Sequence, residues 1–231
     1  METIIQKTKA YMKEKQLGET TGHDWWHTDR VHKMARRIAR QEAGNINMNV
    51  VELAALLHDI EDWKFNDGDE TAGPRAAKAW LSDLGVSEDI QDHVADIIIH
   101  MSFKGNKKKG AMKTIEGQIV QDADRLDAIG AIGLARMFAY GGNIDNEIFN
   151  PEITPRLEMN SKIYKDKSIK SCSFNHMYEK LFFLKELMNT KTATEIAQER
   201  HDYLLDFAKR FLEESEYTES VHYDMLEDFM K

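Results

Sequence analysis

Histidine and acidic side chains follow directly on an apolar run in the first half of the chain. The run LAALL at residues 53–57 is followed by His58, Asp59, Glu61 and Asp62. Burying an ionised carboxylate without a partner costs several kcal/mol, so acids at the margin of a core imply a cation, a hydrogen-bond network or solvent. Imidazole and carboxylate together suit a divalent ion such as Zn, Fe, Mn or Co. A histidine and an aspartate that merely close a helix are the alternative interpretation of this stretch.

Two other stretches carry the same side-chain types. In GHDWWHTDRVHKMA, His23 and His27 are one helical turn apart, a spacing that on its own is more typical of a solvated helix face than of a metal site. In IVQDADRLDAIG, Asp122 and Asp124 lie beside apolar residues. These two acids point about 200° apart on a helix, so only one of them should face an ion.

Taken in order, these motifs resemble the HD-domain superfamily of metal-dependent phosphohydrolases, and within it the YpgQ/YedJ branch. The resemblance rests on GHDWWHTDRVHKMA, ALLHDIEDWKF, IVQDADRLDAIGAIG and HMYEKLFFLKELMNT, which together cover most of the chain. It implies that one metal ion is bound, with Asp124 preferred to Asp122 as the fourth ligand. The implied ligands are His27, His58, Asp59 and Asp124.

The resemblance also suggests roles for neighbouring residues. The superfamily often has an acid three places after the aspartate of its motif, which is Asp62 here, and Glu61 stands beside it. Which of the two is the catalytic base stays open. Arg125 matches a position where related nucleotide hydrolases carry a basic phosphate contact.

The resemblance implies a nucleotide pyrophosphohydrolase, which would cleave a nucleoside triphosphate to a monophosphate and pyrophosphate with metal-activated water. The residues themselves support only hydrolysis of a phosphate ester or anhydride. A 5′-nucleotidase or phosphodiesterase on the same site, and a non-catalytic nucleotide-sensing domain, are the alternatives. Two imidazoles and two carboxylates leave about two positions open on an octahedral ion. We therefore expect Mn, with Mg, Co, Fe or Ni also compatible.

The charge distribution bears on the partner. A formal net charge of -9 repels nucleic acid, so we expect a small-molecule nucleotide whose phosphates are held by a local cluster. Lys104, in the basic stretch KGNKKKG, and His100, just before it, are candidates for substrate binding together with Arg125. The sequence predicts no nucleic-acid partner and does not indicate an oligomeric state.

The elements that must position these residues are all predicted to be helices. Apolar residues recur at three- and four-residue steps, and no segment alternates as a half-buried strand does. We expect an all-α protein, a single-domain helical bundle of the HD-domain type over residues 1–231. Residues 143–174 are predicted to form a long loop and possible lid, and 175–231 C-terminal helices. Ser87 and Thr192 are the predicted N-caps of two helices.

The remaining sequence features concern location. The single cysteine, Cys172, suits a reducing compartment. The first twenty residues contain no apolar run typical of a signal peptide, and no later stretch approaches the roughly 20 apolar residues of a membrane span. We therefore expect a cytoplasmic protein without a membrane partner.

Overall fold

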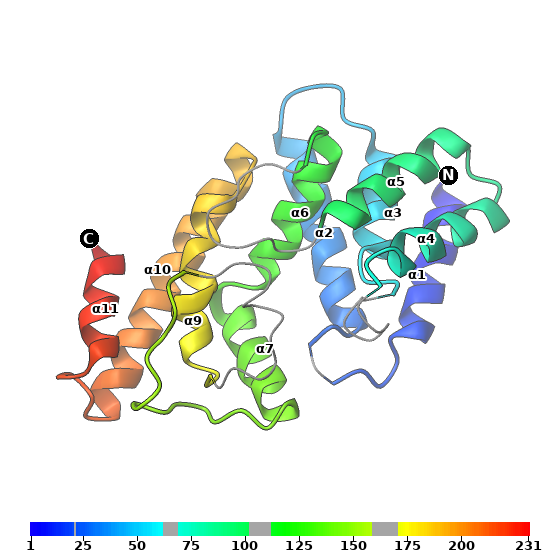
Figure 1. Ribbon diagram of the computed structural model, residues 1–231. Helices are drawn as coiled ribbons and strands as arrows, with labels where there is room; N and C mark the ends of the chain where they lie inside the picture. Colours follow the sequence, from blue (N-terminus) through cyan, green and yellow to red (C-terminus); the bar gives the residue numbers. More distant parts are fainter. Residues whose placement is uncertain (21, 62–68, 102–111, 159–170) are drawn as a thin grey trace. The chain divides into compact units, whose positions relative to one another are not determined.

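The secondary structure of the chain is helical. The computed structural model describes residues 1–20, 22–61, 69–101, 112–158 and 171–231 (Figure 1), and these contain no strand. The prediction of an all-α protein is confirmed. None of the described helices combines the length and apolar character needed to cross a membrane. The elements are α1 (Glu2–Lys15), α2 (Trp25–Gln41), α3 (Met48–Leu57), α4 (Ala72–Asp83), α5 (Glu88–His100), α6 (Ile115–Asp127), α7 (Gly130–Asn143), α9 (Asn175–Glu179), the 3₁₀ helices η2 (Leu181–Phe183) and η3 (Lys185–Leu187), α10 (Lys191–Glu214) and α11 (Val221–Met230).

Two compact units make up the chain. The first comprises Met1–Ser102 and Gly110–Asp124, and the second comprises Phe103–Lys109 and Arg125–Lys231. Helix α6 contributes its residues up to Asp124 to the first unit and its last residues to the second. The single domain expected over residues 1–231 stays a prediction.

Helix α3 is the centre of the first unit. It packs against α1, α2 and α5, and α4 packs on α5. Val50, Val51 and all five residues from Leu53 to Leu57 are at most 1% exposed, so α3 is apolar on nearly every side. A helix of this kind belongs in the interior of a domain. It therefore provides a fixed support for the residues that follow it.

The two ends of α3 determine where the polar motif lies. The Asn47 side chain caps α3 by accepting hydrogen bonds from the backbone N–H groups of Asn49 and Val50. Helix α3 ends at Leu57, and His58 is its C-cap with φ -58° and ψ -33°. His58 and Asp59 therefore lie in the turn that follows the helix, although the elements that position the motif were all predicted to be helices.

One of the two predicted N-caps is confirmed and the other is wrong. Ser87 is the N-cap of α5, although its side chain makes no capping hydrogen bond. Helix α10 begins after Thr190, whose hydroxyl accepts from the N–H of Ala193, so Thr192 is not the cap. A threonine followed three residues later by a glutamate is a real capping pattern, but a second threonine two residues earlier fixes this helix start.

The second unit is organised around α10, which packs against α7, α11 and η3. Phe149 contacts the rings of Phe174, Phe211, Tyr217 and His222, with centroid distances of 5.0–5.6 Å. This aromatic cluster is formed by side chains from α10, from the start of α11 and from residues that precede α9. It joins the C-terminal helices to the rest of the second unit.

Two segments of the second unit differ from the expected helices. In HMYEKLFFLKELM, only a short α-helix forms, and two 3₁₀ helices follow it. Helix α11 has its own N-cap, Ser220, and was not predicted as a separate element. The described residues between Asn143 and Asn175 form no helix or strand. Residues 159–170 lie outside the described part, so the lid stays a prediction.

Candidate metal centre

Three helices of the first unit bring the candidate metal ligands together. His27 lies in the first turn of α2, where the N-cap Asp24 accepts a hydrogen bond of 2.9 Å from its backbone N–H. His58 and Asp59 follow the last residue of α3, and Asp124 lies in α6. The sequence positions span almost a hundred residues, so only the packing of these helices makes the cluster.

The ligand atoms converge on one point. The Nε2 atoms of His27 and His58 are 3.1 Å apart. Asp59 Oδ2 lies 3.4 Å from the first and 3.3 Å from the second. Asp124 Oδ1 lies 3.5 Å and 3.9 Å from the same two nitrogens. Ligand atoms about 2.0–2.2 Å from a common ion are separated by about 3.0–3.5 Å at tetrahedral or right angles, so the cluster has the size of one coordination sphere.

Among the described residues, one set of three has ligand atoms that all lie within 4.8 Å of one another, namely His27, His58 and Asp59. This set can hold a metal ion. Asp124 approaches both imidazoles of the set, as its distances show, and its side chain is 35% exposed. Asp122, its competitor as fourth ligand, is fully buried in the same helix. The assignment of His27, His58, Asp59 and Asp124 as the ligands stays a prediction.

The hydrogen bonding of His58 prepares its imidazole for a cation. Its Nδ1 donates to the carbonyl oxygen of Ala55 at 2.8 Å, so the lone pair of the neutral ring is on Nε2. This backbone contact is the usual way in which a metal-binding histidine is oriented. The lone pair faces the Nε2 atom of His27 and two carboxylates. Such an arrangement needs a proton or a metal ion at its centre, so the residues fit a cation.

The electrostatics of the cluster show the same requirement. Burial lowers the pKa of His58, but the facing carboxylates of Asp59 and Asp124 outweigh it and raise that pKa to about 9. Burial also opposes ionisation of Asp59. The charge of His58, hydrogen bonds from His27 and His58, and the charge of His23 nevertheless hold the pKa of Asp59 well below its usual range. A positive charge is thus strongly favoured here.

The two candidate bases differ in what the structure describes. The Glu61 carboxylate forms an ion pair with Lys15 Nζ of α1 at 2.6 Å, and each side chain is about one-third exposed, at 35% and 32%. Asp62 lies outside the described residues. No local sequence pattern indicates the Lys15 contact, because 46 positions separate the partners.

The structure describes two of the three predicted substrate-binding residues. Arg125 is half-buried, belongs to the second unit, and donates to the carbonyl oxygen of Leu187. His100, at the end of α5, donates from Nδ1 to the carbonyl of Asp96 at 2.7 Å. Lys104 lies outside the described residues. All three assignments stay predictions.

In the sequence, His23 is a candidate ligand only through its spacing from His27. Its ring lies edge-on to the His27 ring, with centroids 5.9 Å apart and planes at 74°. Like Asp124, it is not a member of the three-residue set described above. His23 thus lies directly beside one of the candidate ligands.

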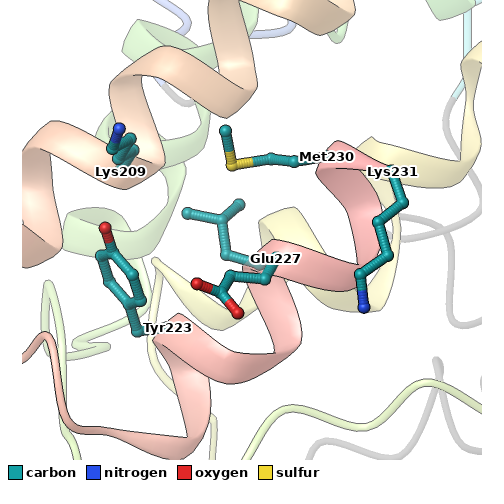
Figure 2. A pocket seen from close by; sticks show the side chains of 6 residues that line it. Lys209, Tyr223, Glu227, Met230 and Lys231 are labelled. Carbon is teal, nitrogen blue, oxygen red and sulfur yellow. The ribbon is translucent and has the colours of Figure 1, made fainter.

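A separate pocket lies in the second unit between α10 and α11. Figure 2 shows Lys209 of α10 opposite Tyr223, Glu227 and Met230 of α11. Its volume is about 250 Å³. Pockets for drug-sized ligands occupy about 300–1,000 Å³, so this one is small for a nucleotide. None of the predicted site residues lines it.

Comparisons with known proteins agree with this geometry. Residues 25–129 match the HD domain family model. The YpgQ protein of Bacillus subtilis (strain 168) is 36% identical over 195 residues, which are 83% of this chain and 84% of YpgQ. A crystal structure of YpgQ in complex with ADP has a TM-score of 0.70 and covers 91% of this chain and 97% of that one, at 32% identity.

Two other solved structures are similar over almost their whole length. An HD-superfamily hydrolase from Bacillus thuringiensis is 41% identical, with a TM-score of 0.70, and the match covers 93% of this chain and 98% of that one. A Lactobacillus plantarum protein is 36% identical, with a TM-score of 0.80, over 95% of this chain and 99% of that one.

Proposed function

This chain belongs to the HD-domain family of hydrolases, and we propose that it hydrolyses a nucleoside triphosphate to a monophosphate and pyrophosphate in a metal-dependent reaction. The observation that carries the proposal is the convergence of two imidazole nitrogens and two carboxylates at 3.1–3.9 Å. Four protein ligands leave about two positions open on an octahedral ion, as catalysis requires and a closed structural site does not.

His27, His58, Asp59 and Asp124 would hold the ion, which we propose to be Mn. When bound, a divalent ion supplies Lewis-acid polarisation of a phosphoryl oxygen and makes water easier to deprotonate. Imidazole and carboxylate ligands are compatible with Mn, and also with Mg, Co, Fe or Ni. The buried α3 would keep His58 and Asp59 in place during turnover.

We propose Asp62 as the base that accepts the proton of the attacking water. The ion pair with Lys15 supports this choice, because it engages the Glu61 carboxylate with a side chain of α1. General-base catalysis contributes about 10²- to 10⁴-fold to the rate. Arg125, Lys104 and His100 are proposed to contact the substrate phosphates.

The proposal that the substrate is a nucleotide is supported by the relative YpgQ, which has a crystal structure in complex with ADP. The net charge of -9 also favours a small phosphorylated substrate over nucleic acid. The choice of the bond between the α- and β-phosphates comes from the resemblance to the YpgQ/YedJ branch.

Product identification tests the proposal. The purified protein is incubated with Mn and, separately, with nucleoside triphosphates, deoxynucleoside triphosphates and monophosphates, and pyrophosphate and orthophosphate are measured independently. We expect pyrophosphate from triphosphates, abolished by Asp59→Asn and retained by Asp83→Asn, which alters an exposed aspartate of α4. Orthophosphate released only from monophosphates would instead identify a nucleotidase. Binding of nucleotide without turnover would identify a sensing domain.

A further inference from the structure

We propose that His23 is a further substrate-contacting residue, whose imidazole N–H donates a hydrogen bond to a phosphoryl oxygen of the nucleotide held at the metal centre. This inference rests on the proposed function. It assigns His23 a role different from that of a metal ligand.

The backbone around His23 is held on both sides. Gly22 has a φ of +91°, a conformation that favours glycine, and it turns the chain into the start of α2. The backbone N–H of His23 donates to a carboxylate oxygen of Glu19 at 2.9 Å. The next residue, Asp24, is the N-cap of α2 and binds the N–H of His27. The position of His23 relative to His27 is therefore defined by a turn and a helix cap.

The side chain lies beside the cluster. Its ring centroid is 5.9 Å from that of His27, and the two ring planes meet at 74°. A group beside the ligands of an ion is at the distance from which an N–H reaches an oxygen of a molecule attached to the ion, because about 2 Å of metal–oxygen bond and about 3 Å of hydrogen bond separate them.

The chemistry of imidazole suits this contact. A neutral imidazole has one N–H donor and a protonated one has two, so His23 can donate a hydrogen bond in either state. His23 is also half-buried, which leaves part of its surface accessible to a ligand. A hydrogen bond to a charged phosphate is stronger than one between neutral groups. His23 would therefore help to hold the phosphate chain beside the ion.

Variants of His23 test this role with three measurements. His23→Ala removes the donor, and His23→Gln keeps an amide N–H in its place. The matched control is His93→Ala, which removes a half-buried histidine of α5 that contacts Thr114 at 2.9 Å. For each protein, Mn affinity, the affinity of the Mn-loaded protein for inorganic pyrophosphate, and kcat/KM for a triphosphate are measured, with thermal melting to confirm folding.

We expect His23→Ala to bind Mn within threefold of wild type, but to lose about 10- to 100-fold in kcat/KM and in pyrophosphate affinity. His23→Gln should recover most of both losses. Unchanged kcat/KM and pyrophosphate affinity in His23→Ala would overturn the inference. A loss of Mn affinity as large as the loss of activity would also overturn it, because His23 would then act through His27. If His23→Ala does not fold, the same criteria apply to His23→Phe, with His23→Gln as its comparison.

The result remains separable from a failure of the proposed function. Absence of pyrophosphate release by the wild-type protein would refute the proposed function. Wild-type activity combined with an unaffected His23→Ala would refute only the role of His23.

Discussion

Metal binding to this protein is expected to depend steeply on pH between 7 and 9, because the metal must displace a proton from His58. In the metal-free protein, burial lowers the pKa of His58, but the carboxylates of Asp59 and Asp124 raise it to about 9. Only about one molecule in a hundred then has a neutral His58 imidazole at pH 7. Apparent metal affinity should rise about ninefold from pH 7 to pH 8 and about fivefold from pH 8 to pH 9, which is about 50-fold in total. An ordinary imidazole would give less than about a twofold change over this range.

The same shift makes the metal-free fold less stable at high pH. A pKa raised from 6.5 to about 9 corresponds to about 3 kcal/mol. Because the folded-state pKa is the higher one, this stabilisation is fully present below about pH 6.5 and is lost as the pH rises to about 9. Metal should reverse the trend, since its own affinity increases over this interval.

Calorimetric titration with Mn at pH 7, 8 and 9, in buffers of different ionisation enthalpy, measures both affinity and proton release. We expect about one proton released per ion bound at pH 7.5. Denaturant unfolding in a chelator, for wild type and His58→Asn, measures the stability term, with His93→Asn as the control. A pH-independent affinity with no proton release would refute the assignment of the bound proton to His58.

Three further predictions concern single positions. Asp62→Asn is expected to lower kcat by about 10²- to 10⁴-fold while Glu61→Gln has a much smaller effect, as steady-state kinetics would show; the reverse order would make Glu61 the base. Glu216 has a φ of +60° at the end of α10, so Glu216→Gly should raise the free energy of unfolding by up to about 1 kcal/mol in denaturant titrations. A Cβ atom at Gly133 would lie 2.2 Å from the Ala128 carbonyl oxygen, so Gly133→Ala should lower that free energy by about 1–3 kcal/mol, and an unchanged unfolding midpoint would contradict this packing.

The helices of the first unit could be predicted because each has a periodic apolar face or a recognisable start. Helix α3 is an example. Its apolar residues identify a helix in the sequence, but only its packing against α1, α2 and α5 shows that the helix is central to the first unit. The segment at η2 and η3 belongs to residues 175–231, which were predicted to form helices for the same local reason. There, Phe182 and Phe183 both contact Phe229 of α11, which is more than 45 positions away in the sequence. The local pattern of apolar residues does not predict contacts over such a separation.

The candidate ligands could be named from the sequence only through the order of family motifs. Spacing alone did not distinguish Asp122 from Asp124, and the structure describes Asp124 at 3.5 Å from His27 Nε2. The Lys15–Glu61 ion pair was not predictable, because no periodicity links α1 to the turn after α3. His23 was recognised as a neighbour of His27 in sequence, but the contact between the two rings depends on the turn at Gly22.

The two helix ends that meet at the cluster have opposite polarity. The carbonyl groups at the C-terminus of α3, next to His58 and Asp59, carry about half a negative charge, which favours a cation. The first turn of α2, where His27 lies, carries about half a positive charge, which favours an anion. The backbone alone thus creates a dipolar environment that suits a metal ion and a phosphate side by side. The contribution of the helix backbones to the electrostatic potential of the site therefore cannot be removed by substituting a side chain.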